Sequence, residues 1–187
     1  MKNMKIYFLL GLIFLISPFL SATDRSQIID DLQSGKWLNQ NNISVHFGEK
    51  QNQKFAFVLS YTECKTLCPM ISNDLKKISE HFPDLKIIII DIRPEKSKIA
   101  DLKKYLGKHK LSENKFQFIK STVEETDRLV KKINLYYTKE ADLEHFDHST
   151  SLVFFDKTSN KLGYIELNNG VDKKSFKQIE EILKNAK

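Results

Sequence analysis

The chain has 187 residues, of which 41% are hydrophobic and 29% charged, with six glycines, four prolines and two cysteines. This composition excludes collagen-like, low-complexity and disulfide-dense proteins and is typical of a single globular domain. The formal net charge is +6, but the lysines are interspersed with acids along predicted helices instead of gathering with aromatics, which argues against a nucleic-acid-binding face.

The first 22 residues have the pattern of an export signal. Lys2 and Lys5 precede the apolar run Ile6–Leu20, and small residues follow it. The run is shorter than the roughly 20 residues that cross a bilayer as a helix, which favours a secretory signal peptide. An uncleaved N-terminal membrane anchor is the alternative. In both cases we expect residues 23–187 to be exported, to the periplasm or the outer face of the inner membrane, where disulfides can form.

The rest of the chain shows alternating strand and helix patterns without repeats or internal linkers. The segment around His46 is hairpin-like. The patterns that follow predict, in order, a strand at 54–61, a helix at 69–82, a strand at 86–92, a helix at 95–106, a strand at 115–119, a helix from 121 to about 135, a loose stretch at 136–148, a hairpin of strands 151–156 and 163–167, and a helix at 172–186. Strand 86–92 is apolar on both faces, as in a central strand covered by helices on both sides. The order predicts a three-layer α/β domain.

The two cysteines stand between the first clear strand and the first clear helix. Cys64 and Cys68 occur as Cys-Lys-Thr-Leu-Cys-Pro, and a helix N-terminus favours thiolates there. Two sulfurs at this spacing can close a small disulfide or bind one soft metal ion. A plain structural disulfide is one alternative. Zinc is another, although it needs further strong ligands and no second cysteine pair exists.

The candidates for a third ligand are the five histidines, which are His46, His81, His109, His145 and His148. His148 ends the loose stretch just before a strand, so a fold that brings this loop beside the cysteines would add an imidazole. His145 is the alternative. Two sulfurs and one imidazole favour copper over zinc. Asp91 ends the central strand and is either a carboxylate near this site or a cap for the loop that follows.

Three segments occur in an informative order: Phe57–Pro69 with the two cysteines, Ile90-Asp91, and His148–Asp156. Together they resemble the Sco/SenC copper proteins, which have a thioredoxin-like fold and serve the assembly of cytochrome c oxidase. The resemblance runs from about residue 54 to 170. The chain departs from the family pattern at Asp91-Ile-Arg-Pro-Glu-Lys, which is two residues longer than the usual run and lacks its second acid.

The resemblance implies a thioredoxin-like three-layer sandwich with a central mixed sheet, and copper, as Cu(I), Cu(II) or both, bound by Cys64, Cys68 and His148 with Asp91 close by. It implies a copper chaperone, not an enzyme in the turnover sense, that delivers copper to cytochrome c oxidase or keeps the cysteines of its copper centre reduced. The expected partner is a cytochrome c oxidase subunit or another copper-carrying protein.

The cysteine pair also allows two alternative functions. In the first, the chain is a thiol–disulfide oxidoreductase without a metal role, in which Cys64 attacks a partner disulfide and Cys68 resolves the mixed disulfide. In the second, the cysteines form an inert disulfide that affects stability alone.

Overall fold

The computed structural model describes residues 36–46, 53–64, 67–138, 147–168 and 170–184, with the backbone alone for Leu67 and Cys68. The predicted leader and His145 lie outside these residues. None of the helices in the described ranges is both long and apolar enough to cross a membrane.

The described residues form one seven-stranded sheet in the order β2-β1-β5-β4-β3-β6-β7. The elements are β1 (Trp37–Asn39), β2 (Ser44–Val45), β3 (Phe55–Ser60), α2 (Leu67–His81), β4 (Lys86–Asp91), α3 (Ile99–Lys108), β5 (Phe116–Lys120), α4 (Val123–Lys132), β6 (Ser151–Phe155), β7 (Lys161–Glu166) and α5 (Lys173–Lys184). The hairpin-like stretch before His46 is confirmed, because β1 pairs antiparallel with β2.

The sheet is mixed, as predicted. Its centre is parallel, with β4 between β3 and β5, while β1, β6 and β7 join it antiparallel. In the register of the central pair, Ser60 lies opposite Asp91. The segments that follow β3 and β4 therefore leave the sheet side by side at one edge, which is where an α/β fold binds ligands.

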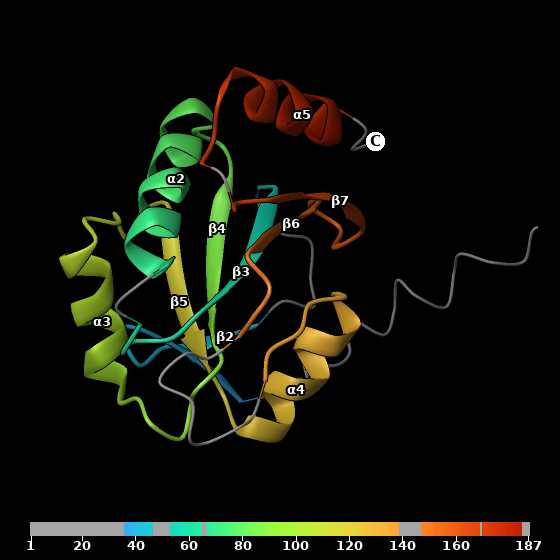
Figure 1. Cartoon of the computed structure of the whole chain (residues 1–187). Helices are drawn as coiled ribbons and strands as arrows, with labels where there is room; N and C mark the ends of the chain where they lie inside the picture. The colour runs from blue at the N-terminus through green and yellow to red at the C-terminus, as the bar shows by residue number, and fades with distance from the viewer. Residues whose placement is uncertain (1–35, 47–52, 65–66, 139–146, 169, 185–187) are drawn as a thin grey trace, which may run out of the picture.

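Helices cover both faces of the sheet, which confirms the three-layer prediction. Figure 1 shows α2 and α3 on one side of the central strands and α4 on the other. Every residue of β3 is buried, as is each isoleucine of β4, because parallel strands sandwiched between helices have no solvent face. The Tyr105 hydroxyl of α3 lies 2.9 Å from Ser60 Oγ and 3.3 Å from Ser72 Oγ, which joins α3, β3 and α2.

The predicted bounds of two helices are wrong. The helix expected from residue 95 begins at Ile99, because the Asp91 carboxylate accepts hydrogen bonds from Arg93 N and Ser97 Oγ and so folds the intervening residues into a loop. The helix expected from 121 to about 135 spans Val123–Lys132, with Thr122 as its N-cap.

Candidate functional site

Cys64 lies in a turn directly after β3, where the sequence predicts it. Its backbone N–H donates to Tyr61 O at 3.3 Å, and the residue is 3% exposed. Cys64 is disulfide-bonded, and the chain's other cysteine, Cys68, lies in the first turn of α2. The structure thus shows Cys64 in its oxidised state at the junction of strand and helix.

His148 lies at the same edge of the sheet. It is 5% exposed, and its Nδ1 is 2.9 Å from Ser149 O. Because a carbonyl oxygen accepts only, Nδ1 carries the hydrogen and Nε2 keeps a lone pair. Burial lowers the pKa of the imidazole, against the opposing effects of the Ser149 hydrogen bond and the Asp147 charge. A neutral imidazole with a free Nε2 and a fixed Nδ1–H is the form that binds metals.

Tyr61 connects the histidine with the cysteine turn. Its ring meets the His148 ring edge to face, with centroids 6.0 Å apart, and its carbonyl accepts the Cys64 N–H. His148 also forms an isolated antiparallel β-bridge with Tyr137, and the Tyr137 hydroxyl donates a hydrogen bond to Asp127. The loop that carries His148 is therefore held against the segment that leads into Cys64.

Asp91 is fully buried at the end of β4. Its carboxylate accepts from Arg93 N at 3.1 Å and from Ser97 Oγ. Burial raises the pKa of Asp91 to about 6, although the Ser97 and Arg93 hydrogen bonds and the Lys120 charge act in the opposite direction. Of the two roles that the sequence left open, the structure shows the loop cap.

Sequence reasoning missed Tyr61 and Arg93. The Arg93 guanidinium carbon lies 5.9 Å from the centre of the Tyr61 ring, and Nη1 is 3.3 Å from Glu63 Oε2. The opposite charges of Glu63 and Arg93 are visible in the sequence, but thirty positions separate them. The contact arises from the parallel pairing of β3 with β4, and nothing local in the sequence indicates it.

The metal-ligand set stays a prediction. Among the side chains that the structure describes, no three histidine, cysteine, aspartate or glutamate residues are grouped so as to hold a metal ion. The Cys68 side chain lies outside that description. The structure brings the Cys64 turn, Tyr61 and His148 to one edge, with Asp91 on the neighbouring strand.

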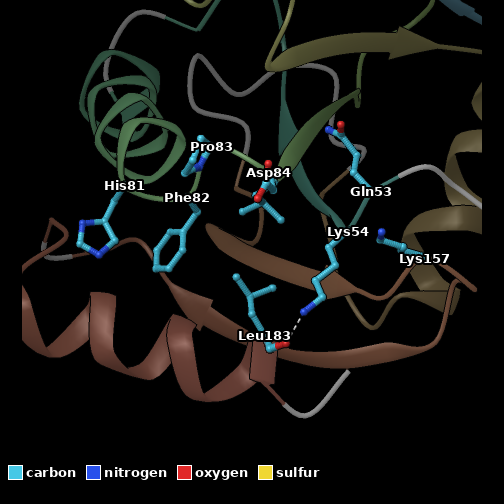
Figure 2. Close-up of a pocket in the computed structure, with 9 residues that line it drawn as sticks. Gln53, Lys54, His81, Phe82, Pro83, Asp84, Lys157 and Leu183 are labelled. Carbon is cyan, nitrogen blue, oxygen red and sulfur yellow. Dashed lines mark hydrogen bonds between the residues drawn. The ribbon is translucent and has the colours of Figure 1, made fainter. Parts of the chain in front are cut away.

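Two other histidines lie at helix ends, since His81 is the last residue of α2 and His109 is the C-cap of α3. His81 lines a pocket of about 660 Å³ at the opposite edge of the sheet, where Lys54 precedes β3. Figure 2 shows this pocket, in which Lys54 Nζ donates to Leu183 O at 2.5 Å. The pocket contains none of the predicted site residues.

Residues 36–184 match the protein family described as SCO1/SenC. A Bacillus subtilis (strain 168) protein described as a SCO1 protein homolog is 31% identical over 117 residues, which cover 58% of this chain and 59% of that relative. The match thus spans about three fifths of the relative's length.

Two solved structures have a similar fold. The crystal structure of Arabidopsis thaliana ScoI with copper bound has a TM-score of 0.65 at 18% identity and covers 79% of this chain and 95% of that one. The structure of BsSco, described as a member of the Sco family of cytochrome c oxidase assembly proteins with a disulfide switch, has a TM-score of 0.65 at 19% identity and covers 79% and 88%. These similarities confirm the thioredoxin-like Sco fold.

Proposed function

Because the chain belongs to the SCO1/SenC family, we propose that it is an exported copper chaperone for the assembly of cytochrome c oxidase, with Cys64, Cys68 and His148 as the ligands of its copper cargo. The observation that carries this proposal is the position of His148. Its ring lies beside Tyr61, whose carbonyl binds the Cys64 N–H, and its Nδ1–H is tied to a backbone carbonyl. This leaves Nε2 available beside the cysteine turn.

The donor atoms suit copper. Thiolate sulfur selects Cu(I), and a set of two sulfurs and one imidazole also accepts Cu(II). Since Cys64 is disulfide-bonded in the structure, loading requires prior reduction. A dithiol supplies two electrons and two protons, becomes a disulfide itself, and converts the bridge to two thiols. Copper binding then displaces the thiol protons.

Ligands on loops at a sheet edge allow copper to leave by exchange. An incoming thiolate of the partner, which we propose is a cytochrome c oxidase subunit or another copper-carrying protein, replaces one protein ligand before the next is released. The ion is then never free. Export fits this role: the leader, residues 1–22, would serve as signal peptide or anchor and leave residues 23–187 as the copper-binding domain on the outer side of the membrane.

The disulfide also favours a second candidate function, a thiol–disulfide oxidoreductase that keeps the oxidase cysteines reduced. Cys64 sits in a bridge at the N-terminal end of α2, where a thiolate is favoured. In that function Cys64 attacks the partner disulfide, Cys68 resolves the mixed disulfide, and the bridge forms again. His148 is then dispensable.

The test is an anaerobic copper titration of the reduced full chain beside His148→Ala. We expect one equivalent of copper, sulfur-to-Cu(II) absorption for the oxidised metal, and weaker binding in the variant. The matched control is His81→Ala, which changes a histidine in the pocket at the opposite edge and should bind copper like the unchanged chain. His145→Ala tests the alternative ligand.

Copper affinity that is unchanged in His148→Ala would remove the proposed ligand set. If the chain then reduces a test disulfide with stoichiometric oxidation of its own cysteines, the oxidoreductase becomes the working function. If it neither binds copper nor reduces disulfides, the bridge is structural.

A further inference from the structure

We propose that Arg93 is a positioning residue that holds the Cys64 turn and His148 in the arrangement that the copper site requires. This inference rests on the proposed function for its copper readout, but not for its redox readout. Arg93 lies two positions after Asp91, in the loop between β4 and α3.

One end of Arg93 is anchored in the core. Its backbone N–H donates to Asp91 Oδ1 at 3.1 Å, and the other carboxylate oxygen of Asp91 accepts from Ser97 Oγ. Asp91 itself is fully buried. The backbone at Arg93 is therefore fixed relative to β4, and the side chain starts from a defined point.

The other end of Arg93 reaches the cysteine turn. The guanidinium carbon lies 5.9 Å from the centre of the Tyr61 ring, and Nη1 lies 3.3 Å from Glu63 Oε2. The Arg93 side chain is 20% exposed and that of Glu63 is 59% exposed, so the cation–π contact is largely shielded from water while the ion pair is more open. A planar guanidinium can lie over a ring and bind a carboxylate with separate N–H groups, which suits it better to join two residues than a compact lysine ammonium.

Tyr61 transmits this restraint to both predicted ligands. Its carbonyl accepts the Cys64 N–H at 3.3 Å, and its ring contacts His148 edge to face at 6.0 Å. Glu63 immediately precedes Cys64. Arg93 thus fixes the residues that lead into Cys64 and the ring that His148 packs against. Such support keeps ligands near their bound geometry before the metal arrives.

The first readout is copper. Arg93→Lys keeps the positive charge but loses the planar guanidinium, and we expect it to weaken Cu(I) binding by the reduced full chain about 2- to 5-fold, because the ammonium keeps part of the cation–π attraction. The matched control is Arg128→Lys, which changes the arginine of an ion pair within α4, 3.2 Å from Glu125. We expect no change there.

The second readout needs no metal. At equilibrium with the protein, dithiothreitol is oxidised to its cyclic disulfide, and its two electrons and two protons reduce the Cys64 disulfide to two thiols. A loosened turn holds the two thiols together less well, so we expect Arg93→Lys to shift this equilibrium toward the dithiol, again about 2- to 5-fold. A role of the charge alone predicts no shift in Arg93→Lys.

The outcomes separate the two proposals. If the unchanged chain binds no copper, the proposed function fails, while the shift with dithiothreitol still decides the role of Arg93. If Arg93→Lys matches the unchanged chain in both readouts, or shifts the equilibrium toward the disulfide, the positioning role is wrong.

Should Arg93→Lys not fold, Glu63→Gln replaces it, because this exposed partner can be changed without opening the core. It should shift the dithiothreitol equilibrium in the same direction by a similar factor, about 2- to 5-fold, as expected for an exposed ion pair. No shift in Glu63→Gln would then overturn the inference.

Discussion

The Asp91 carboxyl combines complete burial with two hydrogen bonds, and this determines how the protein responds to pH. Burial raises its pKa from 3.8 to about 6, so between these values the folded chain binds more protons at this site than the unfolded chain. Stability from this group is complete below about pH 4 and is lost as pH rises through about 6. Burying the charged form thus costs about 3 kcal/mol at neutral pH.

We therefore expect Asp91→Asn to increase the free energy of unfolding at pH 7.5 by about 2–3 kcal/mol and to leave it nearly unchanged at pH 4. The amide stays neutral, its oxygen can accept from Arg93 N, and its NH₂ can donate to Ser97 Oγ. Urea unfolding of the oxidised chain at both pH values is the measurement. A variant that is less stable than the unchanged chain at pH 7.5 would mean that the hydrogen bonds to the charged carboxylate outweigh its burial.

For single residues, the sequence predicts their placement relative to strands better than it predicts their side-chain contacts. The placement of Cys64 after a strand and of His148 before one followed from local patterns, and the structure confirms both placements. The cation–π contact of Arg93 with Tyr61 and the contact of Tyr61 with His148 depend on strand order and register. Those are set by the whole sheet, so no local pattern encodes them.

At the scale of elements, the long apolar strands and amphipathic helices were predictable and their ends were not. Strand β3 is apolar except for Ser60, and β4 has four consecutive isoleucines between Lys86 and Asp91, which gives a clear pattern. Strands β1 and β2 have three and two residues, too few for a periodicity, and they exist through pairing with β5 and with each other. Helix ends depend on which polar side chain finds a backbone partner.

The start of α4 gives a test of this point, because two overlapping capping patterns compete there. Ser121 with Glu124 and Thr122 with Glu125 both fit Ser/Thr-x-x-Glu. The structure uses Thr122, whose Oγ1 accepts from Glu125 N at 3.2 Å, while Ser121 Oγ donates to Lys36 O at 3.0 Å. Because the Ser121 hydroxyl binds the segment before β1, Thr122 caps the helix.

We expect Thr122→Ala to lower the free energy of unfolding by about 1 kcal/mol, the usual loss when an N-cap is removed. Ser121→Ala should cost less, about 0.5 kcal/mol, because its hydrogen bond is exposed. Urea unfolding of both variants measures the difference. Equal losses, or a larger loss for Ser121→Ala, would assign the cap to Ser121.

At the scale of the whole molecule, stability and the proposed copper chemistry come from different parts of the fold. Apolar residues of the sheet and of the helices on both faces form the core, including the Phe55, Phe57 and Phe155 rings, which pack with centroids 5.3 to 5.5 Å apart. The Cys64 turn and His148 lie at the edge of the sheet. A chaperone that cycles between disulfide, dithiol and copper-bound states needs this separation, since its core must persist when the edge changes.

Reduction of the disulfide tests this separation directly. Cys64 is bridged in the structure, and Cys68, the other cysteine, follows four positions later. A bridge that closes so short a loop restrains little of the unfolded chain and contributes about 2 kcal/mol. We expect urea unfolding with reductant to show a cooperative transition with a free energy lower by about that amount, and Cys64→Ser to show the same value with or without reductant. A reduced chain that is unfolded in buffer would identify the bridge as a structural staple, and it would count against both active functions, because each requires a folded dithiol.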